Sequence, residues 1–299
     1  MWSPRSIVYP LSSVEAAPSA VRSVVRWAQR LGIPLHVTPW PGRLPRPESE
    51  VRAQIQALAA SHATLDLRTD AYTRNAFPQT AWQAYVAQHD VDLVVLTPPD
   101  ECAAGPLLSC AKVQPIVART TAAILALPHA AATSFDRVLA PTDMTKEAVP
   151  TLHHAEAIAD FCEAELHALH VLARRQYVAL TRTDMLALDD AAGTPRVAKR
   201  RLRTWYHRHT HPAYSAHAST HIHVEQGDPV SAITRAVQAQ QADLIVLAAT
   251  HHPEHKPALS TLTENVLRRT TCAVLITRPA THSLVDTPTR TPSSQTVSS

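Results

Sequence analysis

The sequence predicts an α/β protein with two tandem doubly wound domains, each a five-stranded parallel sheet in the order 3-2-1-4-5 flanked by helices. Three observations support this prediction. The chain has 299 residues, enough for two domains of ordinary size. Its two halves resemble one another. Each half alternates short apolar runs with amphipathic segments, which is typical of buried parallel strands and their crossover helices. We expect a separate sheet in each half.

The internal repeat is visible near both ends of each half. Residues 91–96 (VDLVVL) recur as residues 242–247 (ADLIVL), at an offset of 151. Residues 7–10 (IVYP) resemble residues 138–141 (VLAP), at an offset of 131. The larger offset later in the chain means that the second half carries about twenty extra residues in its middle.

The second half shows the strand and helix pattern most clearly. Ala148, Leu152, Ala155, Ala159 and Cys162 fall on one face of a helix, and Pro150 lies in its first turn. The G-D-P turn at residues 227–229 starts a second helix. The strands are expected at residues 137–141, 165–172, 221–224, 244–247 and 273–276, and the helices at residues 145–164, after 229, and at 262–269.

The first half repeats this order with less regular motifs. Its strands are expected near residues 7–9, 35–38, 64–67, 93–96 and 123–127. We place a degenerate first domain at residues 1–130, a second domain at 136–279 with a His-rich insert at about 174–220, and a disordered Thr/Ser/Pro tail at 280–299.

Composition excludes several classes of protein. The formal net charge of +3 is too small to favour nucleic acid as a partner. The four cysteines form no C-x-x-C pair, so no zinc ribbon is indicated. No apolar run approaches the roughly 18 residues of a membrane span, and the first residues contain no apolar leader. We therefore expect a cytoplasmic protein without nucleic acid partners or membrane insertion.

The motifs of the second half, taken in order, resemble the universal stress protein family. They are Pro141-Thr142-Asp143, Gly227-Asp228-Pro229, the fourth strand at 243–247, and Thr263 to Leu267 before the fifth strand. The resemblance implies a stress-response protein that acts by binding or by protein contacts. It also implies pairing of domains through the fifth strand, so we expect residues 123–127 and 273–276 to face one another as an internal pseudo-dimer.

Nucleotide-binding members of this family carry the pattern G-x2-G-x9-G-[ST] after the fourth strand. The resemblance aligns its three glycines with Ala249, His252 and Ser260, and its Ser/Thr with Thr261, in a loop two residues too short. Glycines let backbone N–H groups approach phosphates, and the two prolines of residues 250–257 remove such donors. The remnant of the site comprises Pro141, Asp143, Thr261 and Thr263.

The first half has lost more of the same pattern. The aspartate position is Ser12, the Ser/Thr position is Ala111, and Asp100 and Glu101 would repel phosphate. We expect no nucleotide there and no cofactor overall. ATP or AMP in the second domain is the alternative. A structural alternative is that Asp143 and Thr261 only cap helices.

The chain contains 18 histidines, and several of them are candidate metal ligands. His207, His209 and His211 alternate, so on a strand their imidazoles would share one face, although a solvated loop is equally compatible. A second candidate is the loop with His251, His252 and His255, whereas His167 and His170 are interpreted as structural strand residues. We assign no metal site, and metal binding through the His-rich insert is a third alternative.

No motif for catalysis was found. The patterns G-x-S-x-G, H-E-x-x-H and G-x-x-x-x-G-K-[ST] are missing from the sequence. Cys110 and Cys272 lie in or beside expected core elements and are interpreted as buried thiols. The sequence therefore predicts a binding protein and not an enzyme.

Overall fold

The computed structural model places most of both halves. It describes residues 3–11, 18–40, 53, 57, 66–68, 79–97, 113, 116–117, 120–127, 134–172, 194–210, 219–249 and 259–278. The predicted tail at 280–299 lies outside the described residues, as do residues 174–193 and 211–218 of the predicted insert.

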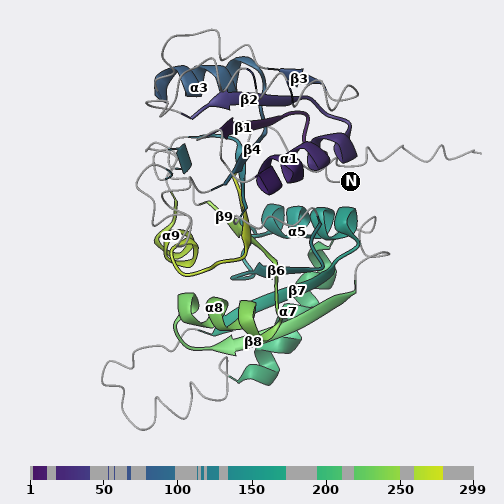
Figure 1. Cartoon of the computed structure of the whole chain (residues 1–299). Coiled ribbons are helices and arrows are strands. Elements are labelled where there is room, and N and C mark those ends of the chain that lie inside the picture. The colour runs from purple at the N-terminus through teal and green to yellow at the C-terminus, as the bar shows by residue number, and fades with distance from the viewer. Residues whose placement is uncertain are drawn as a thin grey trace, which may run out of the picture.

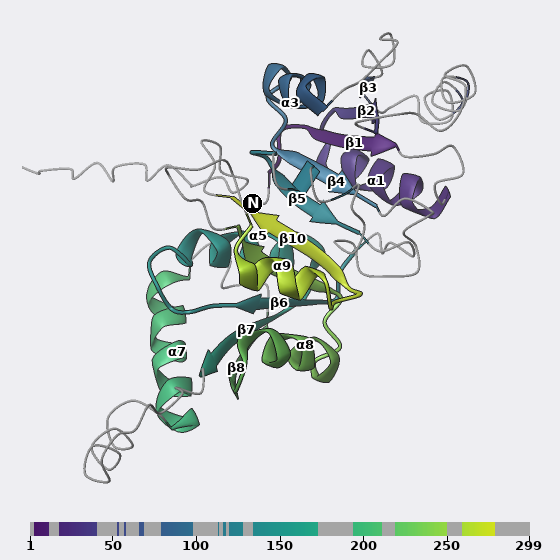
Figure 2. The ribbon, with the colours of Figure 1, turned by 90° about the vertical axis from the view of Figure 1, so that its left-hand side faces the viewer.

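The described residues contain ten strands that form one sheet (Figures 1 and 2). Their order across the sheet is β3-β2-β1-β4-β5-β10-β9-β6-β7-β8, which gives the predicted order 3-2-1-4-5 within each half. All neighbours within a half are parallel. The strands are β1 (Ile7–Leu11), β2 (Leu35–Pro39), β3 (Leu67–Arg68), β4 (Leu93–Leu96), β5 (Ala123–Ala126), β6 (Arg137–Pro141), β7 (Glu165–Leu172), β8 (Thr220–Gln226), β9 (Leu244–Ala248) and β10 (Ala273–Thr277).

The two halves meet at their fifth strands. β5 and β10 pair antiparallel, with Leu125 opposite Leu275 at the centre of the ladder. The expectation of a separate sheet in each half is therefore corrected: the sheet is continuous. The physical reason is that both strands are buried along their whole length, so an unpaired fifth strand would leave apolar surface and free backbone groups at an edge.

Helices cover both faces of the sheet (Figure 1). α1, α5 and α7 contribute to one apolar core, and α3, α8 and α9 contribute to the core on the opposite face. Corresponding helices of the two halves thus lie on the same side. No helix in the described parts of the chain is long and apolar enough to cross a membrane. The bounds are α1 (Pro18–Leu31), α3 (Gln79–Gln88), α5 (Val149–Cys162), α7 (Pro195–His209), α8 (Pro229–Ala239) and α9 (Thr261–Leu267).

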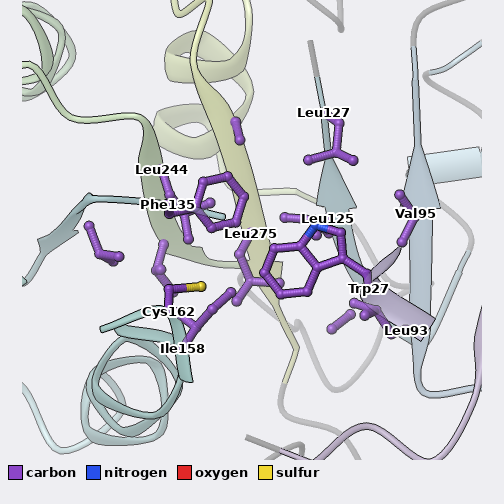
Figure 3. Packing of buried hydrophobic residues seen from close by; sticks show 14 of the residues in the cluster. Trp27, Leu93, Val95, Leu125, Leu127, Phe135, Ile158, Cys162, Leu244 and Leu275 are labelled. Atoms are coloured by element: carbon purple, nitrogen blue, oxygen red, sulfur yellow. The ribbon is translucent and has the colours of Figure 1, made fainter. Parts of the chain in front are cut away.

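A shared core joins the halves (Figure 3). The ring of Trp27 on α1 lies 5.5 Å from that of Phe135 and 5.6 Å from that of Phe161 on α5, measured between centroids. Trp27 is 2% exposed, and Leu125 and Leu275 lie in the same cluster. The guanidinium carbon of Arg30 lies over the Phe161 ring, 4.2 Å from the ring centroid. The halves therefore bury one continuous apolar surface between them.

Helix α5 is shorter than the predicted segment of residues 145–164. It begins at Val149, with Pro150 in its first turn, where a missing N–H costs nothing. It ends at Cys162, and the left-handed φ of 57° at the C-cap residue Glu163 lets the N–H of Glu163 bond back to the carbonyls of Ala159 and Asp160. Residues 142–145 form a turn instead of a helix, and this turn contains Asp143, one of the predicted site residues.

Candidate functional site

The predicted site lies at the carboxyl ends of β6 and β9, which are neighbours in the sheet. Pro141 is the last residue of β6, and Asp143 lies in the turn that follows it. Thr261 and Thr263 begin α9, the helix after β9. Ligands of open α/β sheets bind outside these strand ends, so the sequence placed the residues at the right edge of the fold.

Asp143 stabilises the turn in which it lies. Its Oδ1 accepts hydrogen bonds from the N–H of Thr145 at 3.0 Å and from the Thr145 hydroxyl at 2.7 Å. Asp143 does not cap α5, because the N-cap is Ala148, which makes no side-chain capping bond. The alternative that Asp143 caps a helix is therefore wrong. Its carboxylate instead stabilises an exposed turn, five residues before the N-cap of α5.

His170 fixes the backbone beside Asp143. Its Nδ1 donates to the carbonyl of Thr142 at 2.9 Å, while the Thr142 N–H donates to the carbonyl of Leu169 at 2.8 Å. The N–H of Met144 donates to the Thr142 hydroxyl oxygen at 3.0 Å. The backbone groups around the turn are consequently engaged with one another, and His170 has the structural role that the sequence predicted.

The hydroxyls at the start of α9 form a closed set of bonds. Ser260, not Thr261, is the N-cap, and its Oγ accepts from the Thr263 N–H at 3.0 Å. The same Oγ lies 2.8 Å from Thr263 Oγ1, which donates to the carbonyl of Ala248 at 2.9 Å. Thr261 is exposed and outside this set. The cap was predicted one residue too late, because Thr261 is also a good capping residue type.

The alternating histidines of the insert do not lie on a strand. His207 and His209 belong to the last turn of α7, where residues two apart point in roughly opposite directions. The carbonyl of His209 lies 2.8 Å from Nε2 of His153 on α5. The strand interpretation is therefore wrong, because Lys, Arg, Leu and Trp before the histidines continue a helix that starts at Pro195. His211, His251, His252 and His255 lie outside the described residues.

A histidine pair that sequence reasoning treated separately is brought together on β7 and β8. Burial lowers the pKa of His223 to about 4, and the charges of His167, His221 and Lys199 act in the same direction. Burial also lowers the pKa of His167, followed by the charge of His221, while Glu165 opposes the shift. Both imidazoles are neutral at neutral pH. The signal was present as E-x-H in one strand and H-x-H in the next.

Neither described cysteine resembles a nucleophile. Burial raises the pKa of the Cys272 thiol to about 11, despite the nearby Thr270 hydroxyl. Burial likewise raises the pKa of Cys162. Both thiols are protonated at neutral pH, and a protonated thiol is a weak nucleophile. Cys102 and Cys110 lie outside the described residues.

Comparison with protein families gives a match to the universal stress protein family over residues 134–278. Residues 134–278, which make up the second half of the chain, form a universal stress protein domain. A search of curated proteins finds no sequence match.

Solved structures show the same fold over nearly the whole of this chain. A functionally unknown protein from Pseudomonas aeruginosa PAO1 has a TM-score of 0.69 at 18% identity and covers 93% of this chain and 94% of its own. A putative universal stress protein from Pseudomonas aeruginosa UCBPP-PA14 has a TM-score of 0.66 at 17% identity, with the same coverage. A universal stress protein from Archaeoglobus fulgidus has a TM-score of 0.59 at 15% identity, covering 93% and 97%. At these identities the likeness concerns the fold alone.

The backbone at the first family glycine position is already bonded. Ala249 is buried, and its N–H donates to the carbonyl of Thr277 at 2.7 Å. This N–H continues the ladder between β9 and β10 and does not face an open loop. The second glycine position, His252, lies outside the described residues with the rest of 250–258, as do Ser12, Asp100, Glu101 and Ala111 of the first half.

Proposed function

We propose that this universal stress protein acts in the stress response through contacts with a protein partner and without nucleotide turnover. Family membership supports the stress-response part of the proposal. The single observation that supports action without nucleotide is the closed set of hydrogen bonds at the start of α9, from the Ser260 hydroxyl through Thr263 to the carbonyl of Ala248.

A triphosphate needs several donors that are free when it arrives. Thr263 is 2% exposed, and its hydroxyl already donates to the carbonyl of Ala248. The N–H of Ala249 is already bonded in the sheet ladder. Breaking such a bond to serve a phosphate exchanges one bond for another and leaves the carbonyl of Ala248 unpaired. Helix α9 is only seven residues long, so its dipole adds little. These groups favour a site that has become structural.

We further propose that the pairing of β5 with β10 takes the place of subunit pairing in this protein. The antiparallel ladder and the core around Trp27 support an internal pseudo-dimer, because they leave neither fifth strand at an edge. A cytoplasmic location and the lack of an enzymatic activity belong to the same proposal. The raised pKa values of Cys162 and Cys272 support the second point.

Survival of a strain that lacks this protein tests the proposed function. The wild-type chain should restore survival during starvation or oxidative stress, and Asp143→Ala should restore it equally. Glu147→Ala is a matched control, because it removes an exposed carboxylate four residues along the same loop. Failure of the wild-type chain to alter survival would overturn the stress-response role. If Asp143→Ala alone failed to restore survival, the proposal that the protein acts without nucleotide would be overturned.

One observation favours the alternative, an ATP- or AMP-binding sensor in the second domain. Asp143 is exposed at the carboxyl end of β6, the position where ligands of such sheets bind. A thermal-shift screen with ATP and AMP discriminates the two functions, since a ligand that binds only the folded chain raises its melting temperature. The sensor predicts a rise that Asp143→Ala removes, and the proposed function predicts none.

A further inference from the structure

Four polar side chains gather on one face of the sheet at β7 and its neighbour β8. Glu165 and His167 alternate along β7, and His221 and His223 alternate along β8. The strands are parallel, with His167 directly opposite His221. Side chains two residues apart lie on the same face, so the four groups converge from two adjacent strands.

His167 is buried at the centre of this group. It is 5% exposed, and its Nε2 has no hydrogen-bond partner although it is enclosed by protein. Oε2 of Glu165 lies 3.5 Å from this nitrogen. A buried nitrogen without a partner costs folding free energy, so its position calls for a group that would satisfy it.

We propose that Glu165, His167 and His221 form a binding site for one divalent transition-metal ion of the zinc class. One ligand atom from each residue lies within 4.8 Å of the other two. The corners of a tetrahedral zinc site lie about 3.3 Å apart, given metal–ligand bonds of about 2.0–2.1 Å. Glu165 and His221 are exposed side chains that can close this difference by rotation, while His167 stays fixed.

His223 acts as a positioning residue for His167. Its Nε2 lies 3.0 Å from Nδ1 of His167, and the two rings stack with centroids 5.2 Å apart. If Nε2 of His167 binds the ion, Nδ1 carries the proton and donates it to His223. Metal-binding histidines generally donate their second N–H in this way, which fixes the tautomer and the orientation of the ring.

The donor set selects the class of ion. Two imidazoles and one carboxylate match zinc, nickel or copper, whereas magnesium prefers an octahedron of oxygen ligands. Three protein ligands leave a fourth position for water. Arg137 competes for the site, because its Nε lies 3.5 Å from Oε2 of Glu165. This competition is expected to weaken the affinity without removing it, since both side chains are substantially exposed.

The site is accessible from solvent at the edge of the sheet. β8 is the last strand, and a hollow of about 370 Å³ between β8 and α7 is lined by His221 and His223 together with Lys199, Arg203 and His207. An ion held by residues of both strands would tie the edge strand to β7. Binding should therefore raise the thermal stability of the folded chain.

Calorimetric titration of Zn²⁺ into the full chain, with any purification tag removed, tests the site. We expect His221→Ala to lower the affinity by more than about 100-fold, since the loss of one of three ligands exceeds the 10–100-fold loss seen for outer partners. His207→Ala is the matched control, because it removes an exposed histidine that lines the same hollow but is outside the donor set. It should leave the affinity unchanged, and Mg²⁺ should give no binding.

Two variants of His223 separate positioning from a general effect on folding. His223→Leu removes the acceptor for Nδ1 of His167 and should weaken Zn²⁺ binding about 10-fold or more. His223→Gln retains an acceptor oxygen and should restore most of the affinity. Co²⁺ absorption in the wild-type chain should show tetrahedral coordination that is lost in Glu165→Gln. His221→Ala and Glu165→Gln both lie at exposed positions, so they preserve the fold.

Equal Zn²⁺ affinity in the wild-type chain, His221→Ala and Glu165→Gln would overturn the site and assign any binding to other histidines. Loss of affinity in His207→Ala would overturn it as well. The metal site and the proposed function rest on different residues. Failure of the Zn²⁺ titration therefore leaves the stress-response proposal unaffected, and the converse also holds.

Discussion

The two halves of the chain share one structural device at the start of their fourth strands. Asp92 accepts hydrogen bonds from the N–H groups of Arg5 and Ser6, just before β1. Asp243 accepts from the N–H groups of Asp136 and Arg137, where β6 begins. In both halves a carboxylate fixes the first strand against the fourth. The repeated Asp-Leu motif is thus explained by the fold and does not by itself indicate a ligand.

The halves differ in their outer strands and first helices. β3 is two residues long, whereas β8 has seven residues and is covered by α7. On the first helix, α1 buries Ser23 where α5, at the repeat offset of 131, buries His154. At this position the second half therefore has a titratable group where the first half has a hydroxyl. The shared features maintain the sheet, and the differences are where binding and pH sensitivity should be sought.

The largest expected effect tests whether the halves form one cooperative unit. Trp27→Ala should lower the free energy of unfolding by about 3–5 kcal/mol, since it empties the aromatic contact between α1 and α5. Denaturant unfolding should show a single transition in the wild-type chain. Trp205→Ala, at a partly buried position on α7, is the control and should cost less. Two separate wild-type transitions, with Trp27→Ala shifting only the first, would show that the halves unfold independently.

The paired aspartates should follow in size. Asp92→Ala should cost about 3 kcal/mol, because Asp92 is 6% exposed and also pairs with Arg5 at 3.2 Å. Asp243→Ala should cost about 2 kcal/mol, because its carboxylate is less buried and water can replace it. Urea unfolding of both variants gives the comparison. A larger loss of stability in Asp243→Ala than in Asp92→Ala would contradict the assigned roles of the two carboxylates.

His154 should make stability depend on pH through the second half. Burial and the charge of His153 lower the pKa of His154 from 6.5 to about 4, so the unfolded chain binds more protons between these values. The contribution of neutral His154 to the free energy of unfolding is fully present above pH 6.5 and is lost as pH falls toward 4. Between pH 7 and pH 5 this amounts to about 2 kcal/mol.

Comparison of the wild-type chain with His154→Leu isolates the contribution of His154 to the pH dependence of stability. The variant should lose about 2 kcal/mol less stability than wild type when urea unfolding is measured at pH 7 and then at pH 5. His167 and His223, whose pKa values are also lowered, contribute equally to both chains. Identical pH dependence in the two chains would contradict the assignment to His154.

The smallest effect concerns the cap at the lost glycine position. Ser260→Ala should cost about 1 kcal/mol, because the Thr263 N–H loses its acceptor, whereas Ser260→Gly should cost only a few tenths of a kcal/mol. Thermal unfolding of both variants, with Thr261→Ala as the neighbouring control, measures the difference. A larger loss of stability in Thr261→Ala than in Ser260→Ala would indicate that Thr261 is the N-cap of α9.

Much of the fold could be predicted because its signals are local. The apolar runs predicted β4, β9 and β10, and the G-D-P turn predicted the start of α8, each to within one or two residues. The joining of the two sheets depends on contacts between residues 150 apart, such as Leu125 and Leu275, which no local pattern encodes.

The candidate site was only partly predictable for the same reason. Asp143, Thr261 and Thr263 were placed at the correct edge, but their hydrogen-bond partners depend on turn geometry that residue types do not determine. His167 was interpreted as structural because His221 approaches it only through the pairing of β7 with β8. Spacing along one strand cannot show that the neighbouring strand completes a set of ligands.

Calorimetric titration of ATP and AMP into the purified chain, repeated with Asp143→Ala and Glu147→Ala, tests the central claim most directly. We predict no saturable binding of ATP at near-physiological salt and no hydrolysis, because Thr263 and Ala249 already use their donors within the protein. Heat that survives Asp143→Ala but disappears at raised salt would reflect nonspecific attraction to basic loop residues and would leave the claim intact. A micromolar affinity for ATP that Asp143→Ala abolishes and Glu147→Ala preserves would contradict it and establish the nucleotide sensor instead.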